Sequence, residues 1–175
     1  TGLPVGAIAG SNGNSGLTPV EPFSTIDYAI GQCTANRGDV ICVLPGSTDT
    51  VIAASTIAMD VAGVTVLGFG TGANRPTINY TTATTATCVV SVANCTMINL
   101  LFTGGVDALV SPLNVTGADF KLYGCEYRDV TGQCTDFLLT SAGATRMHVK
   151  NLRYDGADAA GPNAAFAFVG GDDIT

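Results

Sequence analysis

The sequence predicts an all-β solenoid of about five coils, in which each coil corresponds to one sequence repeat. Three observations lead to this prediction. Short apolar strand patterns ending in a turn residue recur every 25 to 31 residues, and a helical pattern occurs once, near the N-terminus. Hydrophobic residues make up 46% of the chain and charged residues 12%, with 22 glycines, which is typical of a globular β-rich protein rather than a disordered one.

The first element is predicted to be an extended N-terminal arm over residues 1–22. Gly, Pro, Ser and Asn are dense between Gly10 and Pro22, and no apolar period is present. Such a segment is either a contact arm for a partner or a disordered leader. We therefore place the β-helix domain at residues 23–175.

A short amphipathic helix and a first strand follow the arm. From Phe23 onward apolar residues fall at helical spacing, Ser24 or Thr25 can cap the helix, and Asp27 suits its first turn. Residues 40–44 then form a compact apolar strand that a Pro-Gly pair ends. The helix is expected to cap the first coil.

The repeats define the remaining coils. Four segments share one pattern of apolar and turn residues: 64–69, 95–100, 120–125 and 147–152. Their common turn position holds Gly68, Asn99, Gly124 and Asn151, at spacings of 31, 25 and 27 residues. Because Gly and Asn accept left-handed backbone at the lowest cost, this position predicts a sharp bend between two strands in every coil. A further apolar strand follows each bend after a variable loop, and residues 172–175 begin another copy, so we expect the chain to be truncated at its C-terminus.

The signature of the first coils resembles a known fold. Residues 22–30, 37–46 and 63–70 are similar to the N-terminal pattern of right-handed parallel β-helix proteins of the pectin-lyase-like superfamily. This resemblance implies a right-handed, single-stranded parallel β-helix with an N-terminal capping helix. Within that superfamily, residues 38–46, 59–68 and 74–77 look most like tailed-bacteriophage structural proteins with β-helix repeats.

The narrower resemblance implies a non-enzymatic structural protein of a phage virion, assembled in the bacterial host cytoplasm. We expect a capsid decoration or cement protein that binds and stabilises the shell as a homotrimer, with capsid or tail proteins as partners. The alternative is a tailspike or tail-fibre β-helix that binds or depolymerises host polysaccharide. A net charge of −7 opposes nucleic-acid binding, and no apolar run approaches the roughly 18 residues of a membrane span.

Catalytic candidates are weak. The superfamily's enzymes act on acidic polysaccharides, and Asp172 and Asp173 resemble the Gly-Asp-Asp element of its polygalacturonase-like hydrolases. The accompanying Asn-Thr-Asp, Gly-His-Gly and Arg-x-Lys elements are missing, so a solvated turn is the preferred interpretation. His148 is the only histidine and is expected to face outward in a surface or stacking role.

The densest acidic group in the sequence is a candidate calcium site. It lies within one coil, near Arg128 and Arg146, and comprises Asp119, Glu126, Asp129 and Asp136. The spacing is not that of a ligand loop, and we expect solvated carboxylates, no metal and no cofactor. The Arg37-Gly38-Asp39 tripeptide is interpreted as a turn rather than an adhesion motif.

Cysteines and tyrosines complete the candidate residues. The six cysteines lack metal-site spacing, and reduced core thiols are favoured over a Cys33–Cys42 disulfide. Carbohydrate binding without turnover would need exposed aromatic rings, for which Tyr123, Tyr127 and Tyr154 are the candidates. Tyr127 and Tyr154 occupy matching positions in successive coils and are expected to stack.

Overall fold

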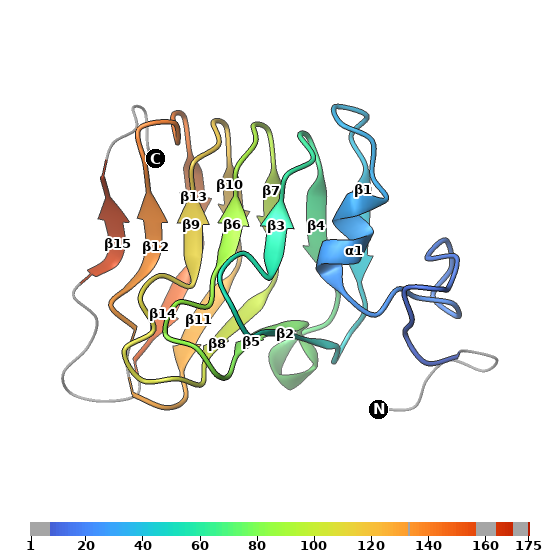
Figure 1. Cartoon of the computed structure of the whole chain (residues 1–175), viewed down its shortest axis with the longest axis horizontal. Helices are drawn as coiled ribbons and strands as arrows, with labels where there is room; N and C mark the ends of the chain where they lie inside the picture. Colours follow the sequence, from blue (N-terminus) through green and yellow to red (C-terminus); the bar gives the residue numbers. More distant parts are fainter. Residues whose placement is uncertain (1–7, 133, 157–163, 170–174) are drawn as a thin grey trace.

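The computed structural model describes residues 8–132, 134–156, 164–169 and 175, and these form a parallel β-solenoid of about five coils (Figure 1). Each coil contributes one strand to each of three parallel sheets, and the coils stack along the long axis of the molecule. The predicted all-β solenoid is therefore confirmed. Asp172 and Asp173 lie outside the described residues.

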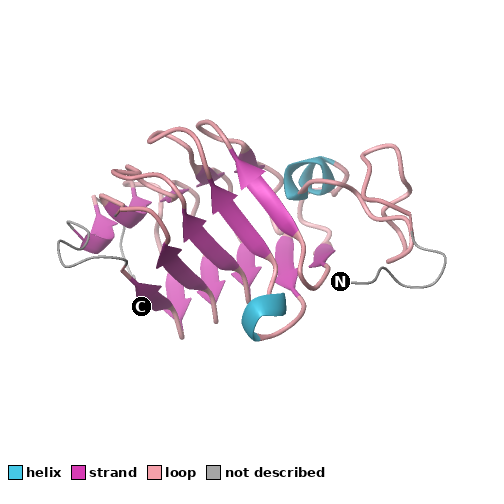
Figure 2. Ribbon diagram, turned by 90° about the horizontal axis from the view of Figure 1, so that it is seen from below, coloured by secondary structure: helices cyan, strands magenta, loops and turns pink. Residues whose placement is uncertain are grey.

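Three five-stranded sheets form the faces of the solenoid (Figure 2). In spatial order, sheet A contains β1 (Val40–Val43), β4 (Thr65–Gly68), β7 (Thr96–Ile98), β10 (Lys121–Tyr123) and β13 (His148–Lys150). Sheet B contains β2 (Thr48–Val51), β5 (Thr77–Tyr80), β8 (Leu101–Gly104), β11 (Glu126–Asp129) and β14 (Arg153–Asp155). Sheet C contains β3 (Ile57–Met59), β6 (Cys88–Val90), β9 (Leu113–Val115), β12 (Asp136–Thr140) and β15 (Ala164–Phe168).

The strand register confirms the predicted repeat alignment. In sheet A, Thr65 lies beside Thr96, Thr96 beside Lys121, and Lys121 beside His148. The amide of Thr175 donates to the Met147 carbonyl at 3.0 Å, and the Thr175 carbonyl accepts from the amide of Val149 at 2.7 Å. Thr175 thus continues sheet A next to His148, in the alignment that the repeats predict.

At the four aligned bend positions between sheets A and B, the backbone is left-handed in three coils and not in the other. Asn99, Gly124 and Asn151 have φ values of 55°, 58° and 55°, as predicted. Gly68 does not have a positive φ; in its coil Gly70 adopts that geometry, with φ 108°. Glycine is needed at position 68 for close approach instead, since a Cβ atom there would lie 2.4 Å from the Asn99 carbonyl oxygen. The Asn99 amide donates to the Gly68 and Gly70 carbonyls at 2.9 and 3.0 Å, which ties the two bends together.

The predicted capping helix closes the N-terminal end of the solenoid. Helix α1 (Ile26–Gly31) begins at Thr25, whose hydroxyl accepts from the Tyr28 amide, and it buries Ile26, Ala29 and Ile30 against the first coil. Its first amide, that of Ile26, donates to the Asp49 carboxylate at 2.7 Å. The helix is thereby fastened to strand β2, while it packs against β1 and β3.

The interior of sheet B changes from polar to apolar along the solenoid. The Asp49 position is followed, coil by coil, by Ile78, Phe102, Tyr127 and Tyr154. Burial raises the pKa of Asp49, and the amide of Ile26 partly opposes that shift. At this position of the coil an acidic side chain occurs in the first coil, where α1 supplies a donor to it.

Residues 8–22, predicted as an extended arm, fold back into a loop beside α1 (Figure 1). Backbone hydrogen bonds join Ile8 to Val20 and Gly16 to Glu21, both at 2.9 Å. Gly16 has a φ of 65° and lies against the ring of Phe23, where a Cβ atom would clash. At the tip of this loop the Leu17 side chain is 88% exposed.

The cysteines are free thiols, most of them buried inside the solenoid. Cys88, Cys95, Cys125 and Cys134 are buried, and burial raises the pKa of Cys125 to about 11. Cys33 is half-buried, whereas Cys42 is exposed on the outer face of sheet A.

We predict that native protein reacts rapidly with a thiol reagent at Cys42 alone, because Cys42 is the exposed residue among the six cysteines. Colour release from Ellman's reagent should show one fast thiol per chain in buffer and six in denaturant. The Cys42→Ser variant should lose the fast phase. Rapid reaction of several thiols would contradict the burial of the others.

Candidate functional site

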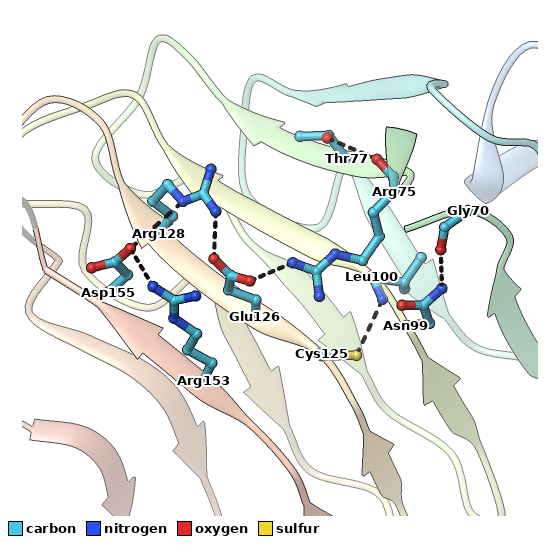
Figure 3. A network of polar contacts seen from close by, with 10 residues as sticks. All are labelled: Gly70, Arg75, Thr77, Asn99, Leu100, Cys125, Glu126, Arg128, Arg153 and Asp155. Atoms are coloured by element: carbon cyan, nitrogen blue, oxygen red, sulfur yellow. Dashed lines mark hydrogen bonds and ion pairs between the residues drawn. The ribbon is translucent and has the colours of Figure 1, made fainter. Parts of the chain in front are cut away.

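The outer face of sheet B carries a network of charged side chains that crosses several coils (Figure 3). We call it the ion-pair ladder, and it consists of Arg75, Glu126, Arg128, Arg153 and Asp155. Glu126 accepts from both Arg75 and Arg128, the latter at 2.6 Å. Arg128 and Arg153 both approach Asp155, at 3.8 and 3.2 Å. Three guanidinium groups therefore share two carboxylates.

The centre of the ladder is shielded from water. The Glu126 side chain is 7% exposed and that of Arg75 is 13% exposed. Burial alone would raise the pKa of Glu126, but hydrogen bonds from Arg75 and Arg128 outweigh it and leave the pKa below its usual range. Arg75 lies just before β5. In sheet B, Thr77 of β5 pairs with Leu101 of β8, and Leu101 in turn pairs with Glu126 of β11. The pair therefore joins the second coil to the fourth.

The other carboxylates of the candidate calcium site point to different places. Asp119 receives two hydrogen bonds from Arg146, at 2.7 and 2.6 Å, and these lower its pKa. Asp129 faces the interior, and Asp136 is half-buried at the start of β12 in sheet C. Among the described residues, no group of three or more His, Cys, Asp or Glu side chains is placed to hold a metal ion. The four carboxylates of one coil are thus distributed over separate contacts.

Asp129 belongs to a buried polar cluster inside the solenoid. Tyr127 and Tyr154 donate from their hydroxyls to its two carboxylate oxygens, at 2.7 and 2.8 Å. The two rings stack with centroids 5.3 Å apart, which confirms the predicted stacking. The Cys134 sulfur lies 3.6 Å from the Tyr154 hydroxyl. Burial and the hydrogen bonds to Asp129 raise the pKa of both tyrosines.

Sequence reasoning placed Asp129 in an outward acidic group and missed this cluster. A signal was present at Gly104, which lies beside Asp129 in the register. A Cβ atom at Gly104 would lie 2.1 Å from the Tyr127 hydroxyl oxygen, so glycine leaves the room that the cluster needs. Because Tyr127 is fully buried, its ring is not presented to a carbohydrate.

The remaining candidates take part in local contacts. His148 is half-buried and its Nδ1 atom lies 2.9 Å from the Tyr123 hydroxyl oxygen, with the two rings edge to face. In the Arg37-Gly38-Asp39 turn the Arg37 guanidinium donates to the Asp39 carboxylate at 2.6 and 2.7 Å. The tripeptide is therefore closed on itself, as the turn interpretation predicts.

Comparison with known proteins adds no family to this description. No protein-family model, curated protein or solved structure matches the chain. In the described part of the chain, no helix is long and apolar enough to cross a membrane. Function has to be inferred from the fold and from the contacts of its side chains.

Proposed function

We propose that this protein is a non-enzymatic structural protein of a tailed-phage virion, a capsid decoration protein that acts as a homo-oligomer. The resemblance of its first coils to phage β-helix proteins indicates the setting. The observation that carries the proposal is the use of charged side chains to hold neighbouring coils together. Carboxylates engaged in this way stiffen a scaffold instead of converging on a substrate.

Charged contacts between coils recur along the solenoid. Arg75 and Glu126 join the second coil to the fourth, and Asp119 and Arg146 lie on either side of the junction between the fourth coil and the fifth. Isolated exposed pairs contribute roughly 0–1 kcal/mol, but buried or shared ones restrict the geometry more strongly. A solenoid stiffened in this way loses little conformational entropy when it binds a shell.

Decoration would work by adhesion. A rigid acidic β-helix that bridges neighbouring shell subunits adds buried area and stabilises the assembled shell by mass action. The N-terminal loop is a natural contact, because Leu17 projects from its tip with its apolar side chain in solvent. Flat sheet faces provide the surfaces for contact between copies.

The test is electron cryo-microscopy of virions from the source phage, compared with virions that lack this protein. We expect β-helix density in many symmetric copies on the shell, and release of DNA at a lower temperature from the deficient particles. Adding purified protein should restore the release temperature. A few copies at the tail tip would instead support the polysaccharide-binding alternative, and absence of the density from both sites would overturn the proposal.

A further inference from the structure

The outer face of sheet A gathers both lysines of the chain and its single histidine. Lys121 and His148 are neighbours on β10 and β13, and so are Tyr123 and Lys150. These four residues, which we call the lysine quartet, form a two-by-two arrangement on adjacent strands. Strand spacing of about 4.8 Å and side-chain spacing of about 7 Å along a strand give the quartet a compact, flat footprint.

The two lysines of the quartet differ from the arginines of the chain in their ion pairing. All five arginines of the chain form ion pairs with carboxylates. Within the described residues, no salt bridge involves Lys121 or Lys150. Asp119, two residues before Lys121, is held by Arg146, and Lys121 adds only a smaller electrostatic contribution to its lowered pKa. A local positive surface therefore remains on a chain of net charge −7.

An apolar strip leads directly into the lysine quartet. The column of outward side chains that ends in Tyr123 and Lys150 begins with Cys42, Leu67 and Ile98. Val40 stands beside this column with its side chain 54% exposed. An apolar strip that ends at two cations resembles the composition of protein–protein contacts, which have an apolar centre and a polar rim.

We propose that the outer face of sheet A is the docking surface for an acidic protein partner, whose aliphatic side chains cover the strip and whose carboxylates meet Lys121 and Lys150. The inference rests on the proposed function, in which this partner is the shell protein. The Tyr123–His148 contact prepares the surface, because it orders two side chains between the lysines before binding.

A second copy of the chain fits this face poorly. Two copies packed in parallel would place lysines against lysines. Two antiparallel copies would place the quartet against the neutral Val40 and Cys42 of the other copy. A saccharide ligand is also disfavoured, since such ligands bind in concave sites and the face of a β-sheet is flat. Charge complementarity therefore favours a different, acidic protein.

The test measures binding of purified protein to phage particles that lack it. The Lys121→Glu/Lys150→Glu variant should bind at least about 100-fold more weakly than the wild type, because each lysine would become a like charge facing a carboxylate. The control is Arg37→Glu/Arg153→Glu, which changes the net charge equally at two exposed positions elsewhere. This control should bind within about threefold of the wild type, since charges outside the contact have small effects on affinity.

Each outcome separates this inference from the proposed function. If the wild type binds and the lysine variant binds equally well, or if the control loses as much, the docking surface is wrong and the decoration role stands. If the wild type itself does not bind, the decoration role fails and the docking surface fails with it. Thermal unfolding should show that both variants stay folded at the temperature of the binding assay, which excludes misfolding as the cause of lost binding.

A second measurement uses His148 as a reporter, since a single histidine gives one set of ring proton resonances. Titration with a short glutamate peptide should shift these resonances in the wild type and leave them unmoved in the lysine variant. An oligogalacturonate of equal charge should shift them less. A larger response to the oligogalacturonate than to the peptide would assign the face to a glycan and overturn the proposal.

Discussion

Replacing Glu126 with alanine is expected to lower the free energy of unfolding by about 3–5 kcal/mol. The side chain is largely buried and accepts from both Arg75 and Arg128. Its removal leaves the Arg75 guanidinium buried without a counter-charge, and the Nε atom of Arg75 already has no hydrogen-bond partner. Chemical denaturation monitored by circular dichroism measures the loss.

Two further variants isolate the cause. Arg153→Ala, at an exposed end of the same ladder, should change stability by less than about 0.5 kcal/mol. Replacing both buried partners, in Arg75→Met/Glu126→Leu, should recover most of the loss, because no unpaired charge remains. If the double variant is as unstable as Glu126→Ala, packing rather than charge pairing explains the effect.

The same pair predicts a pH dependence. Because the folded pKa of Glu126 is lowered, its contribution is complete above the usual glutamate pKa and is lost as the pH falls through the lowered folded value. The wild type should therefore lose stability below about pH 4.5, the ordinary glutamate value. Glu126→Gln should show a flatter acid limb in denaturation curves measured between pH 6 and pH 2.

Replacing Tyr127 with alanine is expected to cost about 3–5 kcal/mol. Its fully buried ring packs against Phe137 and Tyr154, with centroids 4.8 and 5.3 Å away. Tyr127→Phe keeps the ring and removes one of the two hydroxyl donors to Asp129, so it should cost about 1–3 kcal/mol. The difference between the two variants separates ring packing from the hydrogen bond.

Alkaline pH should act on the same cluster. The raised pKa of Tyr127 means that its contribution is complete below the usual tyrosine pKa and declines as the pH rises above it. We expect stability to fall above about pH 10, the ordinary tyrosine value, and to fall less steeply in Tyr127→Phe. Tyr28→Phe is the matched control, because Tyr28 is exposed on α1 and its variant should follow the wild type.

The repeat alignment was predictable because backbone geometry imposes it on the sequence. A left-handed bend admits Asn or Gly, so Asn99, Gly124 and Asn151 identify the same corner in three coils. Glycine is needed at position 68 for a different reason, the close approach of Asn99. The repeat alignment alone does not distinguish a glycine needed for left-handed backbone from one needed for close approach. The sequence pattern did not give the bounds of the sheet B strands, because the outward positions of these strands hold residues as different as Leu101 and Glu126.

The side-chain contacts were less predictable than the coils. Arg75 and Glu126 are 51 residues apart, and their meeting depends on how three coils stack. The Asp129 side chain points into the solenoid, although a carboxylate in a strand is expected to face solvent. Hydrogen bonds from two tyrosine hydroxyls stabilise it there. Local pattern gives the direction of a side chain only when that side chain is apolar.

The contact between Arg75 and Glu126 also determines how the solenoid comes apart. In a linear array each unit normally senses only its immediate neighbours, so unfolding can proceed by fraying one coil at a time. This pair is a next-nearest-neighbour coupling, since it joins the second coil to the fourth across the third. The three coils then open as one cooperative unit, and amides in β5, β8 and β11 should exchange with solvent hydrogen at a common free energy of opening.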